Sequence, residues 1–231
     1  MITMQDKIIW DYLMTKIGNP YGVAGLMGNL YVESKLIPTY LQSTYGKKLN
    51  MTGEEYTKRV DNKSYLNFVN DSAGYGLAQW THSSRKQALL NFVRERNASI
   101  GDLSAQLDYL WLELQTYTTV VTTLRTAKTV REASDIVVKR YEKPKHQEES
   151  YLKTRADYGE KYLRKFNSKC KMVHPTADRT NIRVGNGLKY RRIMQANKCD
   201  SFEYVGTIGN WHAIVVNDQV GWISSEFSKV E

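Results

Sequence analysis

The segment from Gly28 to Ser34 places an acidic residue on a predicted apolar stripe. Glu33 follows Leu26 by seven positions and Leu30 by three, so these side chains share one face of a helix. Burial disfavours an ionised carboxylate, and a carboxyl that stays protonated in a groove can act as a general acid. Spacing alone therefore leaves two interpretations of Glu33: a catalytic proton donor, or an acid at the rim of the core that pairs with an Arg or Lys.

A second segment, residues 70–80, combines glycines with aromatic and amide side chains. Two glycines flank Tyr75, and Gln79 and Trp80 follow directly. Glycine permits tight turns and close approach of the backbone. Aromatic faces stack on sugar rings, and amides form hydrogen bonds with sugar hydroxyls. The segment therefore predicts either a sugar-binding loop or a buried turn.

The elements that must position these residues are helices up to about residue 168. Apolar residues recur at helical spacing, as in Ile9, Leu13 and Ile17 before the stop at Gly18-Asn-Pro20. A Ser or Thr followed three positions later by Glu or Gln is the pattern of a capping box, which predicts where a helix begins. This pattern predicts helix starts at Thr52, Ser84 and Thr129.

The remaining residues change to short apolar runs separated by Gly, Asn and Asp. These runs predict strands at residues 181–184, 202–205, 211–216 and 220–223. About 60 residues with roughly five short strands suggest a small barrel. The sequence therefore predicts an α+β protein, with an α-helical domain over residues 1–168 followed by a small all-β domain over residues 169–231.

The composition excludes several classes of protein. The chain has 231 residues, of which 41% are hydrophobic and 25% charged, which is typical of a globular protein with one or two domains. Its two cysteines cannot build a disulfide framework, and its four histidines are too scattered for a metal site. We therefore expect no metal and no cofactor, and sequence leaves open whether Cys170 and Cys199 pair.

Together, the two segments that could perform chemistry resemble the lysozyme-like superfamily, and within it the phage-type lysozymes of endolysins and tail-tip lysins. The resemblance rests on Val32-Glu-Ser-Lys-Leu36 and Gly74-Tyr-Gly-Leu-Ala-Gln-Trp80. It continues through Arg85, Leu89, the helix from Gln106 to Glu113, Arg140-Tyr-Glu-Lys-Pro144 and Arg155, and covers about residues 1–165.

This resemblance implies an enzyme that cleaves the β-1,4 bond between N-acetylmuramic acid and N-acetylglucosamine in peptidoglycan. It implies that Glu33 protonates the leaving oxygen. The substrate-binding residues that it implies are Ser34, Tyr75, Gly76, Gln79 and Trp80. The expected function is therefore that of a lysozyme, an N-acetylmuramidase of the endolysin type.

Glycoside hydrolysis usually needs a second carboxylate, as nucleophile or as the base that activates water. Asp71 precedes the glycine-rich segment and is the candidate, with a turn residue as the alternative. Glu54 and Asp61 lie in the connecting stretch, and Glu55 fits the capping-box partner of Thr52. Lytic transglycosylases need no second carboxylate, because the substrate's own 6-hydroxyl attacks. A lytic transglycosylase and a non-catalytic wall-binding or phage tail structural protein therefore remain alternatives.

The C-terminal part is similar to a bacterial SH3 (SH3b) domain. The similarity rests on Thr180-Asn-Ile-Arg-Val-Gly-Asn-Gly-Leu-Lys-Tyr190, on residues 209–215 and on residues 221–227. Such modules bind peptidoglycan peptides, crossbridges or wall polymers. The similarity implies wall anchoring, with Tyr190, Tyr204 and Trp211 as candidate contacts and packing in a small barrel as the alternative for each aromatic.

The formal net charge of +9 fits the same partner. Residues 1–168 hold 24 basic and 18 acidic residues, and residues 169–231 hold 9 and 6, so both parts are basic. Such a charge favours a polyanion, which is nucleic acid, an anionic membrane or an acidic wall. The sequence has no nucleic-acid-binding motif and no apolar run of about 18–20 residues, so we expect neither nucleic-acid binding nor membrane insertion. Peptidoglycan and wall polymers are the expected partners.

The N-terminus has no basic segment followed by an apolar stretch, as a signal peptide would have. We therefore expect synthesis in the cytoplasm of a bacterial host and action at the wall after release. The alternative is an exported protein whose leader is missing from this sequence.

Overall fold

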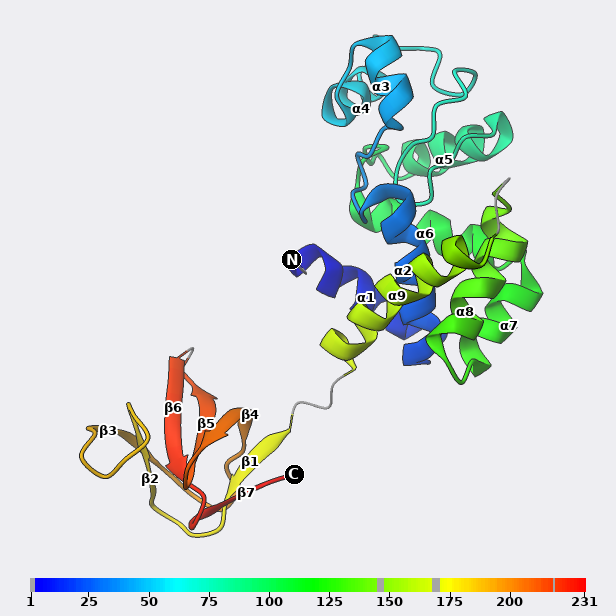
Figure 1. The fold of residues 1–231 in the computed structure, drawn as a ribbon. Helices are drawn as coiled ribbons and strands as arrows, with labels where there is room; N and C mark the ends of the chain where they lie inside the picture. The colour runs from blue at the N-terminus through cyan, green and yellow to red at the C-terminus, as the bar shows by residue number, and fades with distance from the viewer. Residues whose placement is uncertain (1–2, 145–147, 168–170, 218) are drawn as a thin grey trace. The chain divides into compact units, whose positions relative to one another are not determined.

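The structure is a computed structural model that describes residues 3–144, 148–167, 171–217 and 219–231 (Figure 1). The chain divides into two compact units, Met1–Asn167 and Ser168–Glu231. Within the described residues, the first unit contains helices and the second contains strands. The predicted α+β class is therefore confirmed.

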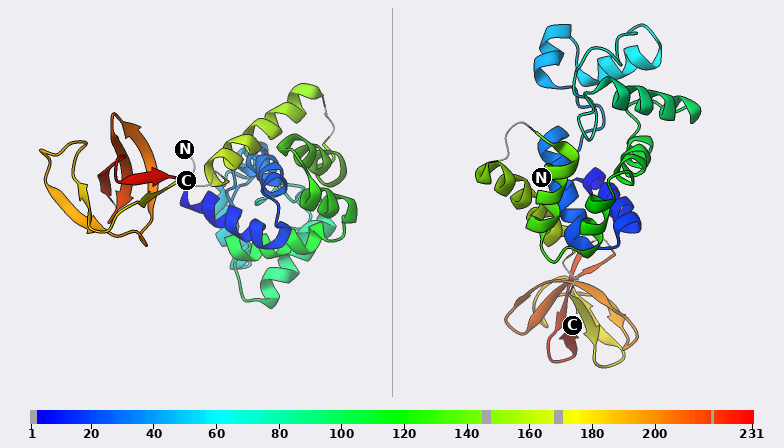
Figure 2. Two further views of the ribbon diagram at one scale, coloured as in Figure 1. Left: turned by 90° about the horizontal axis from the view of Figure 1, so that it is seen from below. Right: turned by 90° about the vertical axis from the view of Figure 1, so that its right-hand side faces the viewer.

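The first unit is built around one central helix. Its described helices are α1 (Met4–Ile17), α2 (Pro20–Ser34), α3 (Ser43–Leu49), α4 (Gly53–Asp61), α5 (Ser83–Glu95), α6 (Leu103–Leu114), α7 (Thr118–Thr126), α8 (Val130–Val137), the π-helical turn η1 (Val138–Glu142) and α9 (Glu149–Phe166). Figures 1 and 2 show α3, α4 and α5 gathered at one end of the unit, with α1, α7, α8 and α9 around α2 at the other. None of the described helices is long and apolar enough to cross a membrane.

Glycines on α2 allow its neighbours to pack unusually close. A Cβ atom at Gly28 would lie 2.3 Å from the backbone oxygen of Arg155 on α9. One at Gly25 would lie 2.6 Å from the Cβ atom of Ala133 on α8. Because neither glycine carries a side chain, α8 and α9 approach α2 closely, which places Arg155 beside the C-terminal turn of α2.

The helix caps agree with two of the three predicted starts. The Thr52 and Thr129 hydroxyls accept hydrogen bonds from the first turns of α4 and α8. The prediction of Ser84 as a cap is wrong, because α5 begins at Ser83 and the His82 side chain accepts the backbone N–H of Ser84. A histidine nitrogen replaces the hydroxyl there, which the capping-box pattern does not include.

The second unit is an antiparallel sheet. Its described strands are β1 (Met172–Pro175), β2 (Thr180–Arg183), β3 (Arg192–Ala196), β4 (Phe202–Ile208), β5 (Trp211–Val216), β6 (Gln219–Ser224) and β7 (Ser228–Val230). Their order is β3-β2-β6-β5-β4-β1-β7, and β5 pairs with β6 along its whole length. Each predicted run overlaps a strand, whereas β1, β3 and β7 were not predicted. Val173, Ile182, Ile214 and Ile223 form a separate small core.

Candidate functional site

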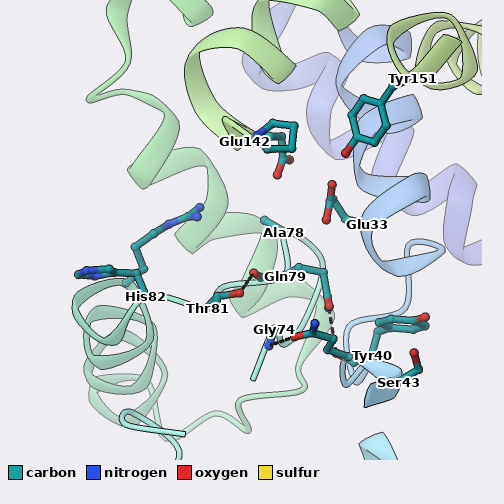
Figure 3. Close-up of a pocket in the computed structure, with 13 residues that line it drawn as sticks. Glu33, Tyr40, Ser43, Gly74, Ala78, Gln79, Thr81, His82, Glu142 and Tyr151 are labelled. Atoms are coloured by element: carbon teal, nitrogen blue, oxygen red, sulfur yellow. Dashed lines mark hydrogen bonds between the residues drawn. The ribbon is translucent and has the colours of Figure 1, made fainter. Parts of the chain in front are cut away.

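A pocket of about 510 Å³ opens in the helical unit beside the C-terminal end of α2 (Figure 3). Its lining comes from segments far apart in the sequence: Glu33, Tyr40, Gln42, Ser43, Gly74, Ala78, Gln79, Thr81, His82, Arg85, Glu142, Pro144 and Tyr151. Most of these residues carry hydroxyl, amide, aromatic or charged groups, and only Ala78 and Pro144 add aliphatic surface. Such a lining suits a polar ligand with many hydroxyls more than an apolar one.

Glu33 lies on this pocket and is held by an ion pair. Arg155 Nη2 lies 2.5 Å from Glu33 Oε1, and the Arg155 and Glu33 side chains are 1% and 21% exposed. The Arg155 Nη1 group also donates to the backbone oxygen of Asn29, which fixes the guanidinium against α2. Both interpretations of Glu33 therefore describe part of its environment: it pairs with an arginine, and it faces a cavity.

Glu142 is the other carboxyl that lines the pocket. It is the last residue of η1, and Lys143 follows in the left-handed conformation, with φ of 47°. Glu142 Oε1 is buried and has no hydrogen-bond partner. Burial, and then the nearby negative charge of Glu33, raise the pKa of Glu142 from 4.5 to about 8. The sequence included Glu142 in the segment from Arg140 to Pro144 but did not identify it as a pocket residue.

A hydrogen-bonded cluster supports one wall of the pocket. Glu113 on α6 accepts from Arg85 Nε at 2.6 Å, from the Tyr141 hydroxyl at 2.6 Å and from Trp80 Nε1 at 3.1 Å. Burial raises the pKa of Glu113, but these hydrogen bonds more than offset burial and hold that pKa below its ordinary value. Glu113 is thus a fixed anion that joins α5, α6, η1 and the loop that contains Trp80.

The glycine-rich segment is a loop fixed from both sides. Ser34 Oγ donates to the backbone oxygen of Leu77 at 2.8 Å, and Gln106 Oε1 accepts from Leu77 N at 2.9 Å. Gly76 has φ of 74°, and a Cβ atom there would lie 2.7 Å from the Gln106 side chain. Gln79 lines the pocket and donates to the backbone oxygens of Tyr40 and Gly76.

The predicted substrate-binding residues therefore separate into two groups. Gln79 lines the pocket, whereas Ser34, Tyr75, Gly76 and Trp80 are buried beneath it. The structure corrects the substrate-contact prediction for these four residues. Ser34 and Gly76 fix the loop, the Tyr75 hydroxyl bonds to Thr57, and Trp80 bonds to Glu113. Tyr40, Ser43 and Tyr151 line the pocket with hydroxyl-bearing side chains instead, and the Tyr151 hydroxyl accepts from Arg155 Nη2, although the sequence patterns did not identify them.

Asp71 does not line the pocket. Its side chain is 4% exposed, and Lys86 Nζ, which is fully buried, lies 2.5 Å from Asp71 Oδ1. The Tyr56 and Tyr65 hydroxyls donate to Asp71 Oδ2, and Ala73 N donates to Oδ1 in a turn. The prediction that Asp71 faces the substrate is therefore corrected, because its oxygens are already bound to buried donors. Burial lowers the pKa of Lys86, an effect that Asp71 opposes.

The C-terminal unit has a groove of its own, with a volume of about 520 Å³. Trp211, Phe227 and the 80% exposed Leu188 form its apolar part. The charged side chains that line it are Asp178, Arg179, Arg183 and Glu226. Apolar and aromatic surface next to charges of both signs suits a peptide or an aminosugar more than a uniformly charged polymer.

The three aromatic residues predicted to bind the wall lie apart from one another. Trp211 lines the groove. Tyr190 lies over the turn formed by Gly185 and Gly187, and the Tyr204 hydroxyl bonds to Thr207. The structure therefore places one of the three at the groove, and the other two outside its lining.

The described residues contain no group of three or more His, Cys, Asp or Glu side chains that could hold a metal ion. Cys199 is exposed. Cys170 lies outside the described residues, so the question of their pairing stays as the sequence left it.

Comparison with known families gives one match. The model of the phage tail lysozyme family matches residues 4–166, which span nearly the whole helical unit and both predicted catalytic segments. A search of the curated proteins finds no match. The family match agrees with the lysozyme resemblance of residues 1–165, whereas the SH3b similarity stays a prediction.

Proposed function

Because the chain belongs to the phage tail lysozyme family, we propose that it cleaves the β-1,4 bond between N-acetylmuramic acid and N-acetylglucosamine. The family makes the helical unit a lysozyme-like domain that acts on peptidoglycan. The bond that is cut, the residues that cut it and wall anchoring by the C-terminal unit belong to the proposal.

The observation that supports the proposal most strongly is the position of Glu33. Its carboxyl faces a polar pocket, while Arg155 and the close packing of α2 against α9 hold it in one orientation. In this proposal Glu33 gives a proton to the glycosidic oxygen as the bond from that oxygen to the sugar breaks. In this proposal the Gln79 amide oxygen and the Tyr40 hydroxyl bind the sugar's polar groups, since both side chains line the pocket.

We expect digestion of purified peptidoglycan to release muropeptides with reducing N-acetylmuramic acid ends, as hydrolysis requires. In hydrolysis, water attacks the sugar and leaves such an end at each cleaved bond. Mass spectrometry of the products before and after borohydride reduction detects these new reducing ends. Products with 1,6-anhydro ends would instead identify a lytic transglycosylase. Absence of any glycan cleavage would favour a non-catalytic wall protein.

For the C-terminal unit, we propose wall anchoring through the groove that contains Trp211. The groove combines apolar and charged side chains in its lining, which suits the short peptides of the wall. The net charge of +3 on residues 169–231 adds a long-range attraction to anionic wall polymers. That attraction should weaken as the salt concentration rises, whereas apolar contacts in the groove should persist.

We expect Trp211→Ala to weaken binding to purified wall by about 30-fold, the effect of losing an aromatic anchor worth about 2 kcal/mol. Co-sedimentation should be measured with full-length protein in the Glu33→Gln background, so that the wall is not digested. Val205→Ala is the matched control, because Val205 is 54% exposed and lies outside the groove. Equal binding by both variants, with the sheet still folded, would contradict anchoring at this groove.

A further inference from the structure

The pocket brings a second carboxyl close to Glu33. Figure 3 shows Glu142, Glu33 and Tyr151 pointing toward one another, from η1, α2 and α9. Glu142 is the last residue of η1, the π-helical turn that follows α8, and the left-handed Lys143 ends the helix directly after it. Such π-helical turns occur often at functional sites. Helix packing thus brings together two acidic residues that are 109 positions apart in the sequence.

We infer that Glu142 is the second catalytic carboxyl of the pocket, sharing a single proton with Glu33 and acting as the base toward the attacking water. This inference rests on the proposed glycosidase function and replaces Asp71 in that role. The buried cation of the site, Arg155, is already bound to Glu33 Oε1, whereas Glu142 Oε1 has no partner. Two acids beside one cation cannot both ionise cheaply, so one of them keeps a proton.

The charged and titratable groups around Glu142 decide which acid that is. They come from α2, α5, α6, η1 and α9, and are Glu33, Arg85, Glu113, Tyr141, Tyr151 and Arg155. Arg155 forms an ion pair with Glu33, and Arg85 is already bound to Glu113. The proton of the resting pair therefore lies on Glu142, in agreement with its pKa of about 8.

A complete catalytic cycle then conserves every proton. The proton passes from Glu142 to Glu33, which donates it to the glycosidic oxygen. The electron pair of the bond between the sugar's C1 atom and that oxygen stays on the oxygen. A water oxygen forms the new bond to C1, and Glu142 takes the proton that this water loses. The cycle ends with Glu33 ionised and Glu142 protonated, as it began, and one water is consumed.

The decisive experiment compares pH profiles of glycan cleavage for Glu142→Gln and wild type, with full-length protein and purified peptidoglycan. In the wild type the rate should fall above about pH 8, where the pair loses its shared proton. We expect Glu142→Gln to be about 10²-fold slower near neutral pH, with the decline starting at a lower pH. Glu95→Gln, at an exposed carboxyl on the last residue of α5, should retain the wild-type profile.

A second measurement detects the shared proton without activity. A raised pKa in the folded state means that the folded chain binds a proton that the unfolded chain has released. The free energy of unfolding should therefore fall as pH rises from about 4.5 to about 8, and Glu142→Gln should remove that slope while Glu95→Gln keeps it.

The outcomes separate this inference from the proposed function. If Glu142→Gln has the wild-type rate and pH profile while Glu33→Gln is inactive, the inference of a shared proton is wrong and the lysozyme assignment stands. Lower stability with an unchanged pH profile would make Glu142 a structural residue and would also overturn the inference. Full activity of Glu33→Gln would overturn the proposed function itself.

Discussion

Glu33→Gln is expected to lower the rate of peptidoglycan cleavage by about 10⁴-fold, the upper range for loss of an acid–base group. Gln has nearly the same size as Glu and still accepts a hydrogen bond from Arg155, but it cannot donate a proton from a carboxyl to the leaving oxygen. The charge on Arg155 does not stay unpaired, because Glu142 lies in the same pocket and can ionise in place of Glu33. Stability should therefore fall much less than activity.

The measurement is the rate of formation of new reducing ends, compared with the midpoint of thermal unfolding of the same preparation. Wall binding reports separately on the C-terminal unit, because its groove lies in the other compact unit, and it should be unchanged in this variant. A folded Glu33→Gln variant with close to wild-type activity would remove Glu33 from the mechanism. A variant that loses activity only because its helical unit is unfolded would show a lower unfolding midpoint, whether or not wall binding persists.

The shared helix face of Glu33 with Leu26 and Leu30 could be predicted from sequence because helical spacing is local, whereas its partner Arg155 is 122 positions away. Leu26, Leu30 and Glu33 lie within two turns of one helix, and helical spacing alone places them on one face. The helix starts at Thr52 and Thr129 were predictable for the same reason, since a cap joins residues two or three positions apart. Local patterns succeed where the physical interaction itself is local.

Glu142 could not be predicted in this way. Its nearness to Glu33 depends on the packing of α8 and α9 against α2, which rests on Gly25 and Gly28. No periodicity in the segment from Arg140 to Pro144 reports that packing. The one local indication was Pro144, which disfavours continuation of a helix and marks where the chain turns.

Residues in the glycine-rich segment show a second limit of prediction from sequence, because residue type did not reveal which of them face the pocket. Tyr75 and Trp80 have the chemistry that sugar binding needs, yet both are fully buried. Residue type gives the chemistry of a side chain but not the direction in which a loop presents it. Gln79 faces the pocket because it adopts a left-handed conformation, with φ of 44°, between buried neighbours. The backbone of this loop therefore determines which side chains reach the substrate.

Asp71→Asn should lower the free energy of unfolding by about 3–5 kcal/mol, the usual cost of removing one partner from a buried ion pair. The change leaves the fully buried Lys86 without its anionic partner, while the Tyr56 and Tyr65 hydroxyls face a weaker acceptor. Urea unfolding measures the loss. Asp11→Asn is the matched control, because the exposed pair of Asp11 with Lys7 should contribute at most about 1 kcal/mol.

The same substitution distinguishes a structural aspartate from a catalytic one. Lys86 Nζ also donates to the backbone oxygen of Ala73, so the pair fixes the chain just before Gly74, which lines the pocket. At temperatures well below the unfolding midpoint of the variant, the rate of cleavage by Asp71→Asn should therefore stay within about 10-fold of the wild-type rate. Loss of an acid–base group would lower the rate far more. Replacing both partners by apolar residues, Asp71→Leu with Lys86→Met, should destabilise less than either single change, because no unpaired charge stays buried. A loss of several orders of magnitude in rate at unchanged stability would instead make Asp71 part of the chemistry, because only a group that acts on the substrate changes the rate without changing the fold.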